Sequence, residues 1–238
     1  MSERFFRTLA RQAAARYPAR DRFARHFAYG KLTGDPVFHH LLAQGLIPSQ
    51  ARVVDLGSGQ GVLAALLVAA KTRHGSGDWP AAWPAPADPS AYVGIELMQK
   101  DVDRARAASG EAADHICGDI RTTGFGSAGA VVILDVLHYI DYAAQAQVLR
   151  RVRDALGEGG VLLLRVGDES DSWRFRYTAA VDRTVMRLRG HKLARLYNKP
   201  LARWKAELAD LGFQVDAVPM SQGTFFANVL LVATLKRA

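Results

Sequence analysis

The sequence predicts an α/β fold, in which a mostly parallel sheet of seven strands carries helices on both faces. From residue 52 onward, short β-rich runs alternate with helix-compatible stretches, as in a sheet wound by crossover helices. A glycine-rich turn also joins the first of these runs directly to a helix. The chain has 238 residues, of which 49% are hydrophobic and 23% charged, so it can bury the core of one α/β domain.

Seven short apolar runs are the candidate strands. The first five are separated by helix candidates, which predicts parallel pairing. The last two follow one another through a turn that contains Pro219 and Gly223, which predicts an antiparallel hairpin at the edge of the sheet. The runs cover residues 53–56, 92–95, 115–116, 131–134, 161–166, 213–218 and 226–235.

All parts of the chain are expected to belong to one domain. Residues 1–45 form a helical extension whose first helix is amphipathic, and residues 50–167 form the alternating core. Residues 170–200 are too long for a simple connection and indicate inserted helices. Residues 200–238 add a helix and the hairpin. Together, the extension and the inserted helices would form a helical cap.

The net charge of +8 is concentrated in residues 1–31 and 173–205, whereas the rest of the chain is net acidic. Such a field favours an anionic partner, namely a nucleic acid, an acidic protein or a small molecule with a phosphate or carboxylate. The alternative is a solubilising surface without a partner.

Cellular location follows from the cysteine content and the apolar runs. The single cysteine, Cys117, allows no internal disulfide and suits a reducing compartment. The longest apolar run, residues 62–70, is far shorter than the roughly 20 residues of a membrane span. The Arg-rich N-terminus resembles a mitochondrial presequence, but its pattern continues past Pro18, which favours a packed extension. We expect a cytoplasmic protein without a membrane span.

The glycine-rich turn is the main functional motif. Residues 55–61 are Asp-Leu-Gly-Ser-Gly-Gln-Gly. Glycines there permit positive φ and close approach of a ligand, and the following helix offers unpaired N–H groups and the positive end of its dipole. Dinucleotides and S-adenosylmethionine both bind such turns. The dinucleotide pattern G-x-G-x-x-G would place its third glycine at Val62, which does not fit.

The pattern acid-x-Gly-x-Gly-x-Gly resembles motif I of class I S-adenosylmethionine-dependent methyltransferases at every position. The resemblance is strong over residues 50–167 and looser over the hairpin at 213–235. It implies a Rossmann-like fold, S-adenosyl-L-methionine as cofactor and methyl transfer as the reaction. The motif I residues that it assigns to the cofactor are Asp55, Gly57, Ser58, Gly59 and Gly61.

The second predicted strand ends in an acid, where this family binds both ribose hydroxyls of the cofactor. Glu96 and the adjacent Leu97 occupy that place, and a carboxylate suits a diol because it can accept two hydrogen bonds. Glu96 lies further from motif I than usual in the family, and the Gly- and Pro-rich loop at 74–90 accounts for the extra length. The alternative for Glu96 is a solvated loop carboxylate.

Further matches follow in order. Residues 117–120 resemble the adenine-binding motif, with Asp119 accepting from the exocyclic amine and Ile120 beside it; a solvated Asp119 is the alternative. The fourth strand ends at Asp135, which we assign to the amine of the methionine portion of the cofactor. Residues 156–164 resemble the helix–turn–strand segment that leads into the fifth strand.

The candidate general base is His138, just beyond the fourth strand at the edge where ligands of such sheets bind. An imidazole titrates near neutrality and could take a phenolic proton. Tyr139 is its neighbour in the predicted catalytic pair. The alternative is a capping or packing histidine. No Cys/His cluster has metal-ligand spacing, so we expect no metal site.

A lid over the substrate is predicted from the aromatic and basic residues after the fifth strand. This segment lies where the family places substrate-covering elements, and a solvated Arg-rich helix is the alternative. The lid residues are Trp173, Arg176, Tyr177, His191 and Tyr197.

The predicted reaction is methyl transfer to oxygen or carbon of a small aromatic or acyl substrate. Residues 95–98, 131–142 and 220–224 resemble bacterial methyltransferases encoded beside aryl-polyene and related pigment pathways, whose acyl chains travel on acidic carrier proteins. A small or carrier-bound anionic substrate would therefore suit the basic segments. RNA methylation and non-catalytic cofactor binding are the alternatives. The oligomeric state does not follow from these residues.

Overall fold

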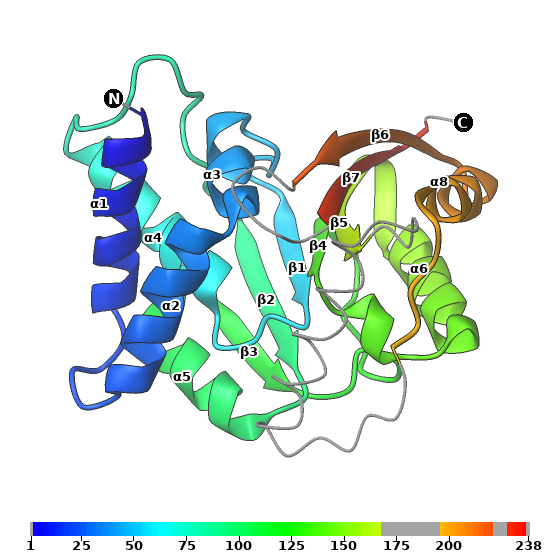
Figure 1. The fold of residues 1–238 in the computed structure, drawn as a ribbon, viewed down its shortest axis with the longest axis horizontal. Helices are drawn as coiled ribbons and strands as arrows, with labels where there is room; N and C mark the ends of the chain where they lie inside the picture. The colour runs from blue at the N-terminus through cyan, green and yellow to red at the C-terminus, as the bar shows by residue number, and fades with distance from the viewer. Residues whose placement is uncertain (1, 168–195, 221–227, 237–238) are drawn as a thin grey trace. The chain divides into compact units, whose positions relative to one another are not determined.

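The structure, a computed structural model, describes residues 2–167, 196–220 and 228–236. The chain divides into two compact units, Met1–Val132 and Ile133–Ala238, here called the N-terminal and C-terminal units. Seven strands form one sheet in the order β3-β2-β1-β4-β5-β7-β6 (Figure 1). This order confirms the predicted Rossmann-like α/β class with an antiparallel pair at one edge.

The N-terminal unit contains the parallel half of the sheet. Strand β1 (Arg52–Leu56) pairs with β2 (Ala91–Glu96) and with β4 (Ala128–Leu134), and β2 pairs with β3 (Asp114–Cys117), all in parallel. The interior residues of β1 and β2 are buried, which fits their mostly apolar sequence, and Asp55 in β1 is a buried acid among them. Because parallel strands end at one edge, this pairing brings the ends of β1 and β2 together.

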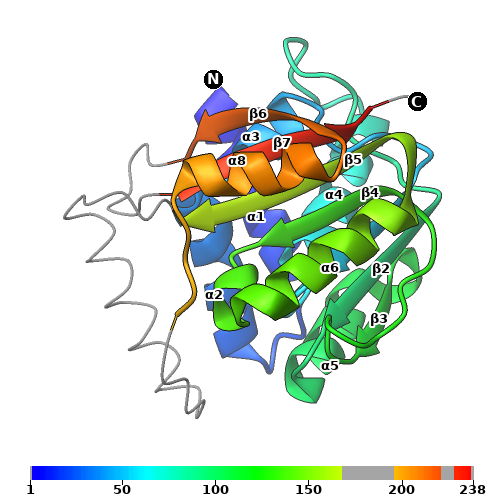
Figure 2. The same cartoon turned by 90° about the vertical axis from the view of Figure 1, so that its right-hand side faces the viewer.

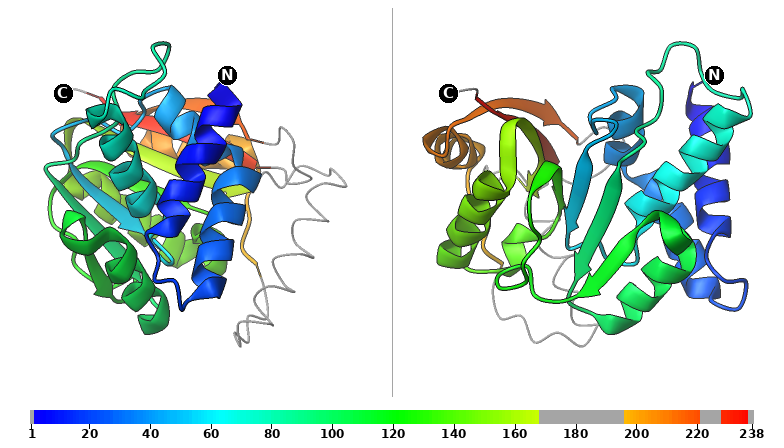
Figure 3. Two further views of the ribbon diagram at one scale, coloured as in Figure 1. Left: turned by 90° about the vertical axis from the view of Figure 1, so that its left-hand side faces the viewer. Right: turned by 180° about the vertical axis from the view of Figure 1, so that it is seen from behind.

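Five α-helices accompany these strands in the N-terminal unit. Helix α1 buries Phe6, Leu9 and Ala13, a spacing that gives one apolar face. It packs against α2 and α4 (Figure 3). The helices are α1 (Ser2–Ala15), α2 (Arg22–Gly34), α3 (Pro36–Ala43), α4 (Val62–Gly75) and α5 (Gln99–Ser109).

The helices of the N-terminal extension begin where the sequence provides caps. Asp21 accepts a hydrogen bond from the Ala24 amide at the start of α2, and Asp35 does the same for Val37 in α3. Pro36 occupies the first turn of α3, where a missing N–H costs nothing. The extension is therefore helical, as predicted.

The long segment between α4 and β2 carries no helix or strand over residues 76–90. Aromatic rings hold it to the N-terminal helix. The Phe5 ring meets Trp79 and Trp83 edge-on, at centroid distances of 5.5 and 5.7 Å. The extra length between motif I and Glu96 is thus a loop held by local packing against α1 and by backbone hydrogen bonds to Gln50 and Ala51, just before β1.

The C-terminal unit contains the antiparallel part of the sheet. Strand β7 (Asn228–Leu235) pairs antiparallel with both β5 (Leu156–Gly167) and β6 (Phe213–Pro219). Helices α6 (Tyr142–Ala155) and α8 (Leu201–Asp210) lie side by side on one face of these strands (Figure 2). Among the described residues, no helix is long and apolar enough to span a membrane.

Candidate functional site

The glycine turn of residues 57–61 follows β1 in the conformation that its glycines permit. Gly57, Gly59 and Gly61 have φ values of 76°, 54° and 76°, which disfavour residues with a side chain. The amides of Gly57 and Ser58 both donate to the Ile95 carbonyl, at 2.7 and 3.1 Å. The turn is therefore held against the end of β2.

Two glycines of the turn face different surroundings. A Cβ added to Gly61 would lie 2.7 Å from the Ala105 Cβ, so this glycine lets α4 and α5 pack closely. A Cβ added to Gly59 would meet no heavy atom of the described residues within 4 Å. The backbone at Gly59 therefore borders open space, as expected of a ligand-binding turn.

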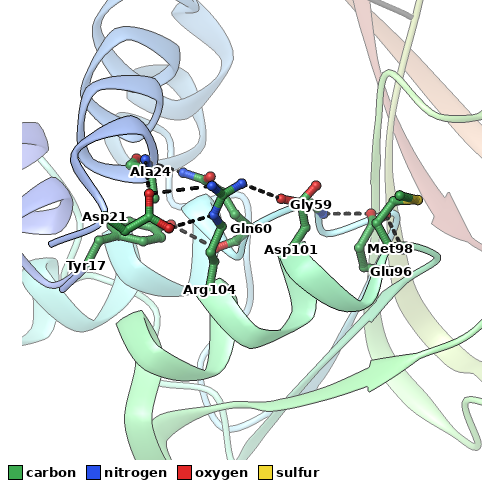
Figure 4. A network of polar contacts seen from close by, with 9 residues as sticks. All are labelled: Tyr17, Asp21, Ala24, Gly59, Gln60, Glu96, Met98, Asp101 and Arg104. Atoms are coloured by element: carbon green, nitrogen blue, oxygen red, sulfur yellow. Dashed lines mark hydrogen bonds and ion pairs between the residues drawn. The ribbon is translucent and has the colours of Figure 1, made fainter. Parts of the chain in front are cut away.

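The Glu96 carboxylate lies at this turn. One oxygen accepts from the Gly59 amide and the other from the Met98 amide, both at 3.0 Å (Figure 4). A carboxylate has about four acceptor positions, so two remain for a ligand. The structure thus brings together Glu96 and Gly59, which are 37 residues apart in sequence.

Exposed apolar side chains follow Glu96. Leu97 and Met98 are 57% and 39% exposed, unusual values for large apolar residues. The Cys117 thiol donates to the Leu97 carbonyl at 3.4 Å, which ties the ends of β2 and β3 together. Leu97 was predicted as a site residue, whereas Met98 was missed because its exposure could not be inferred from the sequence.

Asp119 and Ile120 follow β3. The Gly118 amide donates to the Glu96 carbonyl at 2.9 Å, so this loop lies beside Glu96. Both Asp119 oxygens accept from the Arg121 guanidinium, which holds the Asp119 pKa below its usual value. The carboxylate is therefore ionised at neutral pH, as its predicted role requires. Ile120 is buried.

Asp55 is buried inside the sheet rather than exposed at the turn. Its carboxylate accepts from the Tyr92 hydroxyl at 2.6 Å. Burial, with a smaller contribution from the charge of Glu96, raises the Asp55 pKa to about 7. The structure shows Tyr92 as the hydrogen-bond partner of Asp55, and direct contact of Asp55 with a cofactor stays a prediction.

Two residues at the turn were missed in the sequence. The Tyr17 hydroxyl donates to the Gln60 carbonyl at 2.9 Å, and the Gln60 side chain donates to the Ala24 carbonyl at 2.8 Å (Figure 4). Gln60 occupies a variable position of motif I, and Tyr17 lies 43 residues before it. No local pattern in the sequence indicates this contact.

In the C-terminal unit, Asp135 follows β4 with a φ of 61°. Positive φ is costly for a residue with a side chain, and such strain is found most often at functional sites. Its carboxylate accepts from the Arg165 guanidinium, with Nε to Oδ1 at 2.7 Å, and Arg165 is only 1% exposed. The predicted contact of Asp135 with a cofactor amine stays a prediction.

His138 lies in a short 3₁₀ turn, Leu137–Tyr139. Its ring contacts that of Tyr139 with centroids 4.0 Å apart, and its carbonyl accepts from the Tyr197 amide at 2.9 Å. The structure thus brings together both predicted catalytic residues and one predicted lid residue within this unit. The other lid residues lie outside the described residues: Trp173, Arg176, Tyr177 and His191.

A buried glutamine of α6 supports this turn and was also missed. The Gln145 amide nitrogen lies within hydrogen-bond distance of the Leu137, Ile140 and Tyr197 carbonyls, at 2.9, 3.1 and 2.7 Å. In the described parts of the chain, no three His, Cys, Asp or Glu side chains gather in a way that could hold a metal ion.

A sequence model of the methyltransferase domain family matches residues 12–218. No match is found among curated proteins. Among solved structures, the chain is similar to magnesium protoporphyrin IX methyltransferase from Synechocystis PCC 6803 with bound SAH. The alignment covers 90% of this chain and 88% of that one, at 18% identity and a TM-score of 0.60.

Two O-methyltransferase family structures have the same fold. The protein from Burkholderia thailandensis aligns over 92% of this chain and 60% of its own, at 18% identity and a TM-score of 0.63. The protein from Planctomyces limnophilus DSM 3776, in complex with apigenin, aligns over 88% and 58%, at 16% identity and 0.57. The chain thus spans less than two thirds of the length of these two structures.

Proposed function

Because the chain belongs to the methyltransferase domain family, we propose that it transfers the methyl group of S-adenosylmethionine to oxygen or carbon of a small aromatic or acyl substrate. The observation that carries this proposal is the Glu96 carboxylate, hydrogen-bonded to the Gly59 amide where the turn borders open space. This arrangement offers acceptors for a diol and bare backbone for the rest of the ligand.

The described residues fit S-adenosylmethionine. The two remaining acceptor positions of Glu96 suit the ribose hydroxyls, and the exposed Leu97 and Met98 suit the face of an adenine ring. Asp119, held ionised by Arg121, could accept from the adenine amine. When bound, the cofactor supplies an electrophilic methyl group on a sulfonium.

The C-terminal unit supplies the candidate groups for the methyl acceptor. We assign His138 as the base that would take a proton from an oxygen or carbon acceptor, with Tyr139 against its ring. The Tyr197 amide and Gln145 hydrogen-bond to backbone carbonyls of the turn, which restrains the backbone that carries His138. The Asp135–Arg165 pair holds the strained end of β4.

The choice of a small substrate rests on similarity and charge. Magnesium protoporphyrin IX and apigenin, the substrate and ligand named for two similar structures, are small ring compounds. The exposed Arg4, Arg11 and Arg20 of the N-terminal segment favour an anionic substrate, free or bound to an acidic carrier protein. The same arginines would suit RNA, which is the competing substrate class.

Calorimetry on the purified chain tests the cofactor assignment, with S-adenosylmethionine, S-adenosylhomocysteine and a nicotinamide dinucleotide as titrants. We expect heat of binding with the first two only. A Gly59→Val variant should give none, because valine disfavours a φ of 54° and its side chain would occupy the open space that the cofactor needs. Heat with the dinucleotide alone would overturn the assignment.

Transfer of a labelled methyl group tests the substrate class. Phenolic acids, acyl carrier protein loaded with an aromatic acyl chain, and total RNA serve as acceptors. We expect label in one of the first two. Labelled RNA, with binding that weakens steeply as salt rises, would favour the RNA alternative. Cofactor binding without transfer to any acceptor would favour a non-catalytic role.

A further inference from the structure

The N-terminal helices contact the glycine turn through a reciprocal pair of hydrogen bonds. The hydroxyl of Tyr17, which lies two residues after the end of α1, donates to the backbone carbonyl of Gln60. In return, the Gln60 side chain donates to the backbone carbonyl of Ala24 in the first turn of α2. Tyr17 and Gln60 are both buried, so solvent does not compete for these bonds.

A second link ties the start of α2 to α5. The Arg104 guanidinium donates to Asp21 at 2.8 Å and to Asp101 at 3.1 Å, and its carbon centre lies 5.0 Å from the centroid of the Phe23 ring. Asp21 is also the residue that caps α2. One carboxylate thus organises the first turn of α2 and holds it to the helix that begins just after Glu96.

The Tyr17–Gln60 link reaches the glycine turn directly, whereas the Arg104–Asp21 link holds the start of α2, to which the Gln60 side chain donates. Figure 4 shows both links beside the contact between Gly59 and Glu96. Glu96 binds the amide of Gly59, and Tyr17 binds the carbonyl of the next residue. The N–H group of Gly59 and the carbonyl of Gln60 are therefore each bound by a side chain from a distant part of the sequence.

We propose that Tyr17, Gln60 and Arg104 are positioning residues that set the glycine turn for S-adenosylmethionine, so that docking of α1 and α2 and binding of the cofactor reinforce each other. This inference rests on the proposed function. None of the three residues needs to touch the cofactor, because Tyr17 and Gln60 act through hydrogen bonds to backbone carbonyls and Arg104 acts through Asp21 at the start of α2. Coupling of this kind is reciprocal: the cofactor should stabilise the helices as much as the helices favour the cofactor.

Tyr17→Phe removes one hydroxyl and keeps the packed ring. We expect the Kd for S-adenosylhomocysteine, measured by calorimetry well below the melting temperature, to rise about 5- to 10-fold, as for loss of one buried hydrogen bond. Tyr29→Phe in α2 is the matched control, because the Tyr29 ring contacts Arg11 rather than the turn. This control should keep the wild-type Kd.

Hydrogen exchange gives a readout that a merely structural role would not move. In the wild type, S-adenosylhomocysteine should slow exchange in residues 57–61 and also in residues 22–34 of α2. In Tyr17→Phe the slowing in α2 should be lost at saturating ligand, whereas that in the turn should remain. Asp21→Asn, which keeps the acceptor for Ala24 but weakens the Arg104 pair, should act in the same direction.

The outcomes separate this inference from the proposed function. A wild type that does not bind S-adenosylhomocysteine would defeat the proposed function. A wild type that binds, together with variants that melt earlier but keep both Kd and exchange pattern, would defeat only the positioning role. If Tyr17→Phe does not fold, Asp21→Asn carries the same test.

Discussion

Single residues at the ends of β1 and β2 decide whether the turn can receive a ligand. Glu96 holds two backbone amides, Gly59 provides a conformation that side chains disfavour, and Asp55 lies buried beside them. These three residues act by different physical means: hydrogen bonding, backbone freedom and burial of a titratable carboxyl group. Each can therefore be tested by a substitution that removes one property.

Glu96→Ala should weaken binding of S-adenosylhomocysteine by about 1–3 kcal/mol, because the ligand loses a charged acceptor. The Gly59 and Met98 amides lose the same acceptor. Calorimetry measures the change. The affinity of Glu96→Gln, which keeps one acceptor oxygen, should be between those of Glu96→Ala and the wild type. Wild-type affinity in Glu96→Ala would contradict the assignment.

Asp55 predicts a pH dependence of folding. Burial raises its pKa from 3.8, the ordinary value of the group, to about 7 in the folded chain, so the folded state holds a proton that the unfolded state releases. Stability contributed by this group is therefore present below pH 4 and lost as pH rises to about 7.

Asp55→Asn keeps an oxygen that can accept from Tyr92 and removes the titration. The variant should gain stability over the wild type as pH rises from 4 to 8, by an amount on the order of 4 kcal/mol for a shift of this size. Urea unfolding at several pH values measures the difference, and a difference that does not change with pH would contradict it.

At the scale of elements, short turns are held by side chains from neighbouring helices. Gln145 of α6 donates to carbonyls in and after the turn that carries His138, and Arg165 of β5 holds Asp135. In the N-terminal unit, the Tyr17 hydroxyl donates to the Gln60 carbonyl, and the Gln60 side chain donates to a backbone carbonyl of α2. In each unit, the candidate residues thus lie on irregular backbone that side chains hold in place.

Gln145→Leu should destabilise the chain by about 1–3 kcal/mol, because it leaves buried carbonyls without a donor. Gln147→Leu, an exposed position of the same helix, is the matched control and should change stability by less than about 0.5 kcal/mol. Urea unfolding compares the two variants. Equal effects would show that the donated hydrogen bonds do not matter.

For the whole molecule, the candidate cofactor residues and the candidate base belong to different compact units. Glu96 and the glycine turn lie in the N-terminal unit, whereas His138 and Tyr139 lie in the C-terminal unit. Cofactor affinity and turnover should therefore respond to different substitutions.

His138→Ala should lower turnover about 10²- to 10⁴-fold, the usual contribution of a general base, and leave cofactor affinity unchanged. Initial rates with the accepted substrate and calorimetry with S-adenosylhomocysteine measure the two properties. Recovery of the rate at high pH, where the acceptor ionises unaided, would support the role of a base. Unchanged turnover at neutral pH would remove it.

The sequence alone determined the fold class and the glycine turn, because both depend on local properties. The runs that became β1, β2 and β5 are apolar and β-rich, and the three glycines of motif I permit the φ values that the turn adopts. The place of Glu96 was also predictable, since it ends a strand parallel to β1.

Only the tertiary structure decided which residues support these features. Tyr17 and Gln60 are 43 residues apart in sequence, and Arg104 and Asp21 are 83 apart. No repeating pattern in the sequence indicates that either pair is in contact. The burial of Asp55 and the exposure of Met98 likewise depend on how strands and helices pack. Local conformation depends on the preferences of neighbouring residues, which can be read from the sequence. Contacts between residues far apart in sequence depend on how the helices and strands pack together.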